Sequence, residues 1–140
     1  MATQAISSHG TKLKVGDGAD PEVFATIAEV VDITGPGQTL NTEDVTNHDS
    51  GGWREVIPTI LEGGEVTFDV NYFGDATHTA ILTDIKARAF RNFEMEYPDG
   101  SKDEFGGYFT AFSKAAPVEG ILRASVTIAI SGAVTETPAA

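Results

Sequence analysis

Alternation of apolar and polar residues predicts most of the strands of this chain. It is clearest over 65–72 and recurs over 90–97, 104–114 and 121–130. The second and third of these segments are joined by Pro98, Asp99 and Gly100, residues typical of a tight hairpin turn. Each segment has one apolar and one polar face, so we expect antiparallel sheets that each cover one side of a core.

Weaker signals complete the regular structure. Residues 11–15 alternate weakly, and residues 23–33 form a β-rich run with turn-forming residues at both ends. Apolar residues at spacings of three and four predict one helix over 76–89, with Asp75 as its N-cap. The pair Gly106-Gly107 inside a predicted strand indicates a bulge or a close approach of backbone.

The segment 38–64 differs in composition from its neighbours. It is rich in Thr, Asn, Asp, Glu and Gly, which predicts a long extended loop of the kind that is usually functional in a compact domain. Its second half holds an apolar island of Trp53, Val56, Ile57, Ile60 and Leu61. Leaving such residues in water is unfavourable, so the island packs either on its own domain or on another copy of the chain.

The order of these elements predicts an α+β protein that is mainly antiparallel β, a β-sandwich or barrel with one flanking helix. With 140 residues the chain has the size of one domain. We expect that domain to span residues 11–132, between a flexible N-terminal arm (1–10) and a loose C-terminal tail (133–140).

The net charge limits what the domain can bind. Nine Lys and Arg against 21 Asp and Glu give a formal charge of −12 at pH 7. Between Asp17 and Asp75 there are thirteen carboxylates and a single base, Arg54, so this stretch holds the whole net charge. We therefore do not expect a basic surface that binds a polyanion. No apolar run approaches the length of a membrane helix.

No catalytic or metal-binding motif stands out. The chain has no cysteine, which excludes disulfides, thiolate metal sites and cysteine nucleophiles. His9, His48 and His78 lie far apart in the sequence, and we expect them to be solvated rather than ligands. Glu94 and Glu96 share one face of a strand, which is more typical of a solvated face than of a glycosidase pair. We predict a protein that is not an enzyme and holds no cofactor or metal.

Several turn motifs carry a resemblance to a known family. They are residues 27–37 (IAEVVDITGPG), 62–68 (EGGEVTF), 97–101 (YPDGS) and 105–109 (FGGYF), with the predicted helix between the second and third. In order and spacing they resemble the tail tube proteins of bacteriophages with long non-contractile tails, the siphophages. The resemblance covers about residues 11–132. That family is related to the inner tubes of contractile tails and of type VI secretion systems.

The resemblance implies a β-sandwich whose copies form hexameric rings, stacked head to tail into a tube through which DNA passes during ejection. It implies that the loop 38–64 reaches a neighbouring ring, with Arg54 and the apolar island as intersubunit contacts. The acidic charge then suggests a lumen that repels duplex DNA. The candidate acids that face this lumen are Glu65, Asp69, Glu94 and Glu96.

The same resemblance implies the partners and the location. These are other copies of the chain, the tape measure, tail terminator and distal tail proteins, and double-stranded DNA that passes without tight binding. The protein is expected in the virion, after assembly in the host cytoplasm and without contact with a membrane. Two alternatives stay open: a tube subunit of a type VI secretion or other phage-derived particle, or a small β-sandwich that binds carbohydrate or protein through Trp53, Tyr72 or Tyr108.

Overall fold

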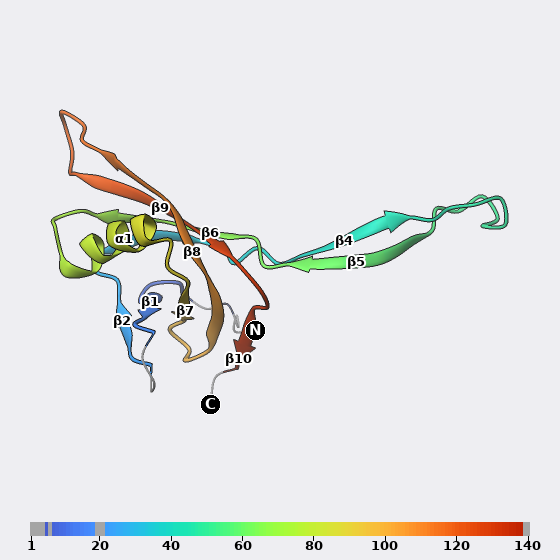
Figure 1. Cartoon of the computed structure of the whole chain (residues 1–140), viewed down its shortest axis with the longest axis horizontal. Helices are drawn as coiled ribbons and strands as arrows, with labels where there is room; N and C mark the ends of the chain where they lie inside the picture. Colours follow the sequence, from blue (N-terminus) through green and yellow to red (C-terminus); the bar gives the residue numbers. More distant parts are fainter. Residues whose placement is uncertain (1–4, 6, 19–21, 139–140) are drawn as a thin grey trace.

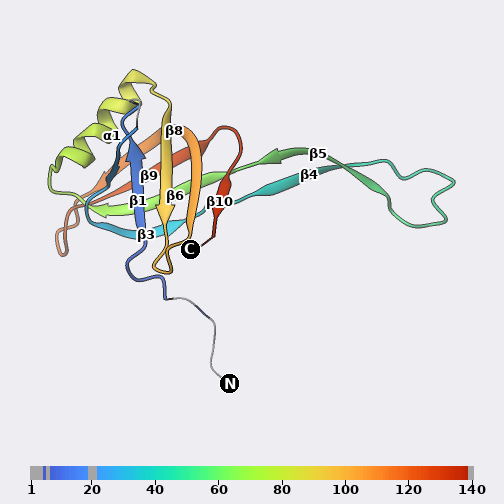
Figure 2. The same ribbon diagram turned by 90° about the horizontal axis from the view of Figure 1, so that it is seen from below.

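A computed structural model describes residues 5, 7–18 and 22–138. One continuous eight-stranded antiparallel sheet folds over into two layers, here called the first and the second sheet, which pack face to face (Figure 1 and Figure 2). The first sheet has the order β2 (Phe24–Thr26), β1 (Lys12–Gly16), β7 (Arg91–Glu96) and β8 (Lys102–Ala115), with β10 (Thr135–Thr137) also paired to β8. The second has the order β8, β9 (Arg123–Ile130), β6 (Glu65–Asn71) and β3 (Val30–Thr34). The predicted α+β class is confirmed, and the sheets form a sandwich without closing into a barrel.

The core lies between the two sheets. Phe93 of β7 is 1% exposed, and its ring centroid lies 5.6 Å from that of Phe105 and 5.1 Å from that of Phe109. From the second sheet, alternate residues of β6 point inward and are buried, namely Val66, Phe68 and Val70. Burial of each such side chain contributes roughly 1.5–3 kcal/mol to folding. The apolar residues of the alternating segment 65–72 therefore lie on the inner face of the sandwich.

Strand β8 belongs to both sheets. Its first part pairs with β7 up to Gly107, and its second part pairs with β9 from Gly107 to Ala115. The glycine pair lies at this junction. A Cβ at Gly107 would collide with the carbonyl oxygen of Ala129 on β9, and a Cβ at Gly106 would collide with the ring of Phe90. The close approach predicted for this pair is confirmed.

One helix, α1 (Ala76–Ala87), packs at one end of the sandwich. The Asp75 side chain accepts a hydrogen bond from the backbone N–H of Thr77 at 2.9 Å, which confirms the predicted N-cap. His78 is completely buried, donates from Nε2 to the carbonyl oxygen of Ala28 at 2.6 Å, and stacks on Tyr72. The prediction that all three histidines are solvated is thus wrong for His78, because it lies on the face of α1 that packs on the sheets.

The segment 38–64 forms a second, separate structure. Strands β4 (Thr39–Asp44) and β5 (Val56–Glu62) pair in a two-stranded hairpin, here called the arm, which extends far from the sandwich (Figure 1 and Figure 2). The predicted loop is extended, but it is a regular ribbon. Its β5 sequence does not alternate because neither of its faces has a core to cover. It contains Pro58, which is tolerated on a strand with a free edge.

Two other segments differ from prediction. Residues 23–33 form two strands, β2 and β3, separated by a turn in which Glu29 has a φ of 51° and its carbonyl accepts a hydrogen bond from the N–H of Asn71. No Gly or Pro marks this turn in the sequence. The segment expected to be a loose tail contains β10, which is too short to produce a pattern. Residues 1–4 and 6 of the expected N-terminal arm, and residues 139–140 of the tail, lie outside the described part of the chain.

Candidate functional site

Both edges of the second sheet lack a partner strand among the described residues. Strand β3 pairs only with β6 along its length, and from Tyr108 to Ala115 strand β8 pairs only with β9. Because β8, β9, β6 and β3 alternate in direction, the two free edges run antiparallel to each other. An open edge presents unpaired N–H and C=O groups that can bind another strand. These edges could not be predicted from the sequence, because backbone pairing leaves no signature in the residue types.

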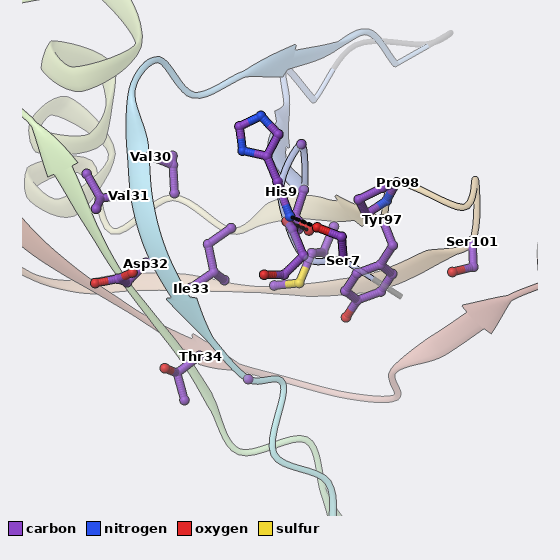
Figure 3. A pocket seen from close by; sticks show the side chains of 15 residues that line it. Ser7, His9, Val30, Val31, Asp32, Ile33, Thr34, Tyr97, Pro98 and Ser101 are labelled. Carbon is purple, nitrogen blue, oxygen red and sulfur yellow. Dashed lines mark hydrogen bonds between the residues drawn. The ribbon is translucent and has the colours of Figure 1, made fainter. Parts of the chain in front are cut away.

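A cavity of about 1260 Å³ borders the free edge of β3 (Figure 3). Side chains of Val30 to Thr34 line one side of it, and Tyr97 and Pro98 from the end of β7 line another. Within the described residues, no three His, Cys, Asp or Glu side chains come together as metal ligands, here or elsewhere. The cavity therefore leaves space beside the unpaired edge of β3.

The predicted contact residues of the loop all lie on the arm and are largely exposed. Trp53 is 79% exposed, Leu61 77% and Ile60 67%, while Val56 and Ile57 are about half exposed. Adjacent residues of a strand point to opposite faces, so the neighbours Val56 and Ile57 place apolar side chains on both faces of the ribbon. The arm therefore presents apolar surface on both sides.

Arg54, the single base of the acidic stretch, lies beside a carboxylate on the same arm. Its Nε atom is 4.0 Å from Oδ2 of Asp44, and both side chains are well exposed, so this ion pair contributes little to stability. Hydrogen bonds from the side chain and backbone of Thr46 hold the pKa of Asp44 below its ordinary value. The carboxylate stays ionised at neutral pH and keeps the arm acidic.

The four candidate lumen acids are not brought together. Glu65 and Asp69 lie on the outward face of β6, and Glu94 and Glu96 lie on the outward face of β7, in the other sheet. Because the sheets pack face to face, their outward faces point in opposite directions. One lumen can therefore be lined by one of these pairs, not by both.

The two pairs also differ in their electrostatic surroundings. Lys102 Nζ lies 3.1 Å from Oε1 of Glu94, and Lys14 Nζ lies 2.7 Å from Oε2 of Glu96. The bond from Lys14 lowers the pKa of Glu96, and the bond to Glu94 raises the pKa of Lys102. Glu94 is only 7% exposed, so the expectation of a solvated face is wrong for it. The neighbouring strands β1 and β8 carry the lysines that cover it.

Glu65 and Asp69, in contrast, form no ion pair with a described residue. Oδ1 of Asp69 accepts a hydrogen bond from the hydroxyl of Ser125 at 2.7 Å, and Glu65 is exposed. The outward residues of β6 and β9 are otherwise small, amide or hydroxyl side chains, with Arg123 as their one base. This face is polar and carries two carboxylates that form no ion pair with a described residue, together with one cation, Arg123.

The predicted hairpin turn is confirmed. The N–H of Tyr97 donates to the carbonyl oxygen of Ser101 at 2.9 Å, and Gly100 has a φ of 92°, which favours glycine. Oδ1 of Asp99 accepts hydrogen bonds from the hydroxyl and the N–H of Ser101, which lower the pKa of Asp99. With Pro98 in the wall of the cavity, the turn shapes the surface beside β3.

The aromatic residues of the binding-module alternative lie apart. Trp53 is on the arm, the Tyr72 ring lies 4.4 Å below Lys114 Nζ, and Tyr108 packs edge-on against Phe90. No single stacking platform unites them. In the described part of the chain, no helix has the length and apolar character needed to cross a membrane.

Two open sheet edges and an exposed apolar arm are surfaces that another protein chain can cover. Comparison with known families agrees. The family model described as lambda phage tail tube protein matches residues 9–137, and the chain belongs to this family. It is therefore a structural component of phage-type tails and is not an enzyme.

Solved structures share the fold over nearly the whole chain. A chain from the tail of an empty gene transfer agent particle, refined with C6 symmetry, is 19% identical, with a TM-score of 0.81 over 96% of this chain and 100% of that one. The SPP1 tail tube is 12% identical, with a TM-score of 0.68 over 95% and 79%. A chain from the sheath/tube terminator of the PVC extracellular contractile injection system is 11% identical, with a TM-score of 0.73 over 99% and 100%. No curated protein sequence matches significantly.

Proposed function

We propose that copies of this chain close into rings through the free edges of the second sheet. The supporting observation is that these edges, on β3 and on Tyr108–Ala115 of β8, run antiparallel and lie on opposite sides of one four-stranded sheet. Related by rotation, neighbouring copies can pair β3 with β8 and continue the sheet without a parallel seam. Closure removes the exposed edges, which would otherwise recruit other strands. The C6 symmetry printed for the related gene transfer agent tail suggests six copies.

Rings of this kind stack into a siphophage tail tube, with the arm reaching the adjacent ring. The outward face of the second sheet then lines the lumen, and Glu65 and Asp69 lie on it. Duplex DNA carries about one negative charge per 1.7 Å of its axis, so a basic lining would hold it during ejection. An acidic and hydroxyl lining lets DNA pass without tight binding. Glu94 and Glu96, already paired with lysines, lie on the outer wall of the tube.

Electron microscopy of the concentrated, purified chain tests the assembly. Rings or hollow tubes are expected, and the tube terminator and baseplate named for related structures are the kind of partners that cap such tubes. A chain that stays monomeric at every concentration, in conditions that keep the sandwich folded, would contradict the proposal.

The lumen is tested by one charge reversal on each face. Tubes of Glu65→Lys assembled with short duplex DNA are expected to retain DNA that nuclease cannot digest, because the added cations face the lumen. Tubes of the control Glu104→Lys, an exposed residue of β8 in the first sheet, are expected to retain none, like the natural chain. Equal retention by both variants would show that the second sheet does not line the lumen.

A further inference from the structure

The two sides of the sandwich that carry the free edges are built differently. On one side, here called the closed side, β8 passes from the first sheet into the second at Gly106 and Gly107. On the other, here called the open side, none of the described strands continues from β3 into the first sheet, and the cavity of about 1260 Å³ lies there. Figure 2 shows the bend of β8 at the top and β3, with the turn after β7, at the bottom.

The closed side carries a pair of exposed aromatic rings. The ring centroids of Phe90 and Tyr108 lie 5.5 Å apart in an edge-on arrangement, and the side chains are 49% and 41% exposed. Phe90 lies directly over Gly106, where a Cβ would collide with its ring, so the glycine seats the pair. Tyr108 points away from the core, because its neighbour Phe109 is buried. At the bend of β8 this outward direction is sideways, away from the sandwich.

The open side carries an apolar hollow. Val30, Val31 and Ile33 of β3 line one wall, and Tyr97 and Pro98 line the opposite wall (Figure 3). The hydroxyl of Tyr97 already donates to a carboxylate of its own chain, at 2.5 Å. Pockets of roughly 300–1,000 Å³ hold drug-sized ligands, so this cavity has room for two aromatic side chains.

The aromatic pair and the cavity lie at the same end of the second sheet. Tyr108 pairs in register with Ala129, which pairs with Glu65 beside the base of the arm. Thr34, the last residue of β3, pairs with Thr67 and lines the cavity. Copies related by rotation keep these ends on the same side. When β8 of one copy pairs with β3 of the next, the aromatic pair therefore faces the neighbour's cavity.

We infer that the rings of Phe90 and Tyr108 insert into the cavity beside β3 of the neighbouring copy in the ring. The inference rests on the proposed pairing of the edges and adds a side-chain contact to it. When a strand is added to a sheet, backbone hydrogen bonds give affinity and pockets for side chains give specificity. Aromatic side chains are typical anchors of interfaces, and each can bury roughly 150–250 Å².

The contact would fix how neighbouring copies align. Backbone pairing between β3 and β8 alone permits registers that differ by two residues, because such a shift keeps the same faces inward. A filled cavity selects one of these registers. Each chain carries one aromatic pair and one cavity, on opposite sides, so the contacts run around the ring in one direction and close it.

Cysteine cross-linking tests the contact, because the natural chain has no cysteine. The double variant Arg88→Cys/Ser101→Cys keeps both rings and places one thiol beside Phe90 and one in the cavity wall. Treated with a short bismaleimide after assembly, it is expected to give covalent multimers larger than dimers. The two positions lie at opposite ends of β7, which spans roughly 20 Å, so the reagent cannot join them within one chain. Each single variant can give dimers at most.

A second cysteine pair reports the edges alone. Thr34→Cys/Ala111→Cys places one thiol on β3 and one on the free part of β8, and it is expected to give multimers whenever the edges pair. Multimers from this control, without multimers from Arg88→Cys/Ser101→Cys, would overturn the inference and leave the proposed ring intact. Absence of multimers from both variants would contradict the proposed ring and the inference together.

Truncation of the aromatic pair tests its contribution to assembly. Phe90→Ala/Tyr108→Ala is expected to raise the protein concentration needed for rings about tenfold, measured by analytical ultracentrifugation. Its urea midpoint should stay near that of the natural chain, because both rings are about half exposed. The control Glu104→Ala, exposed on β8 in the first sheet, is expected to assemble normally. Normal assembly of the truncated variant would overturn the inference. The cross-linking variants keep both rings, so they decide the question even if the truncated sandwich is unstable.

Discussion

The sandwich and the arm use similar residues in opposite ways. Strand β6 buries Val66, Phe68 and Val70 at every second position, whereas β5 leaves Ile57 and Ile60 exposed. The difference lies in the pattern and not in the apolar content. A strand that covers a core on one face must alternate, and a ribbon with no core on either face has no reason to do so. The unpatterned apolar segment is thus the one available to another chain.

The two regions also differ in what holds them together. The sandwich has a shared core under two sheets, while the arm has a single ladder of backbone hydrogen bonds. A two-stranded hairpin is marginally stable in water. Most of the folding free energy of the chain therefore resides in the sandwich, and the arm contributes little to it.

The largest difference between the two regions is expected in their rates of amide hydrogen exchange. Amides of residues 41–60 in the unassembled chain should exchange about a thousandfold faster than the amides of β6 and β9, since core amides need nearly global unfolding. Exchange monitored by NMR or mass spectrometry measures this ratio. Protection of the arm equal to that of β6 would show that it is stable without a partner.

Truncation of a core ring is expected to destabilise the sandwich strongly. Phe93→Ala removes a buried ring between Phe105 and Phe109 and should lower the free energy of unfolding by about 3–5 kcal/mol. Urea denaturation measures it. The control Leu61→Ala on the arm should change that free energy by less than about 0.5 kcal/mol. A loss of similar size in both variants would mean that the arm shares the core's stability.

Truncation of Trp53 should affect assembly more than folding. Trp53→Ala is expected to leave the free energy of unfolding within about 0.5 kcal/mol of the natural value, because the side chain is exposed. The protein concentration needed for tubes should rise about tenfold, as for the loss of an aromatic contact residue. Light scattering during assembly measures the threshold, with the exposed Val23→Ala as control. Unchanged assembly would remove Trp53 from the contact.

The smallest effect is expected at the helix N-cap of the sandwich. Hydrogen bonds from Thr77 lower the pKa of Asp75 in the folded chain, so its stabilisation is complete above the unfolded pKa of about 3.9 and is lost as pH falls through the lower folded pKa. Asp75→Ala should lower Tm by a few degrees at pH 7, and the difference should shrink below about pH 4. Asp75→Asn, which keeps an acceptor, should lose less. A difference independent of pH would show that ionisation of Asp75 contributes nothing.

Much of the sandwich could be predicted because its strands alternate and its helix begins at a recognisable cap. The failures have common physical causes. The turn at Glu29 adopts a positive φ without glycine, since contacts with Asn71 hold it. Glu94 is covered by a lysine from another strand, and pairing across strands is invisible along the chain. The apolar island of the arm is visible in the sequence, whereas the free edges of the second sheet exist only once the strands are arranged in space.

Strand β8 gives the subunit a mechanical property. One continuous backbone of 14 residues runs from the first sheet into the second, so the two sheets cannot slide past each other without breaking hydrogen bonds along it. In the ring that we propose, a force that tilts the second sheet would be transmitted through β8 to the first sheet. The two sheets would then bend together as one unit. Gly106 and Gly107 have no room for side chains, so the neighbouring residues pack tightly at the point where β8 passes from one sheet to the other.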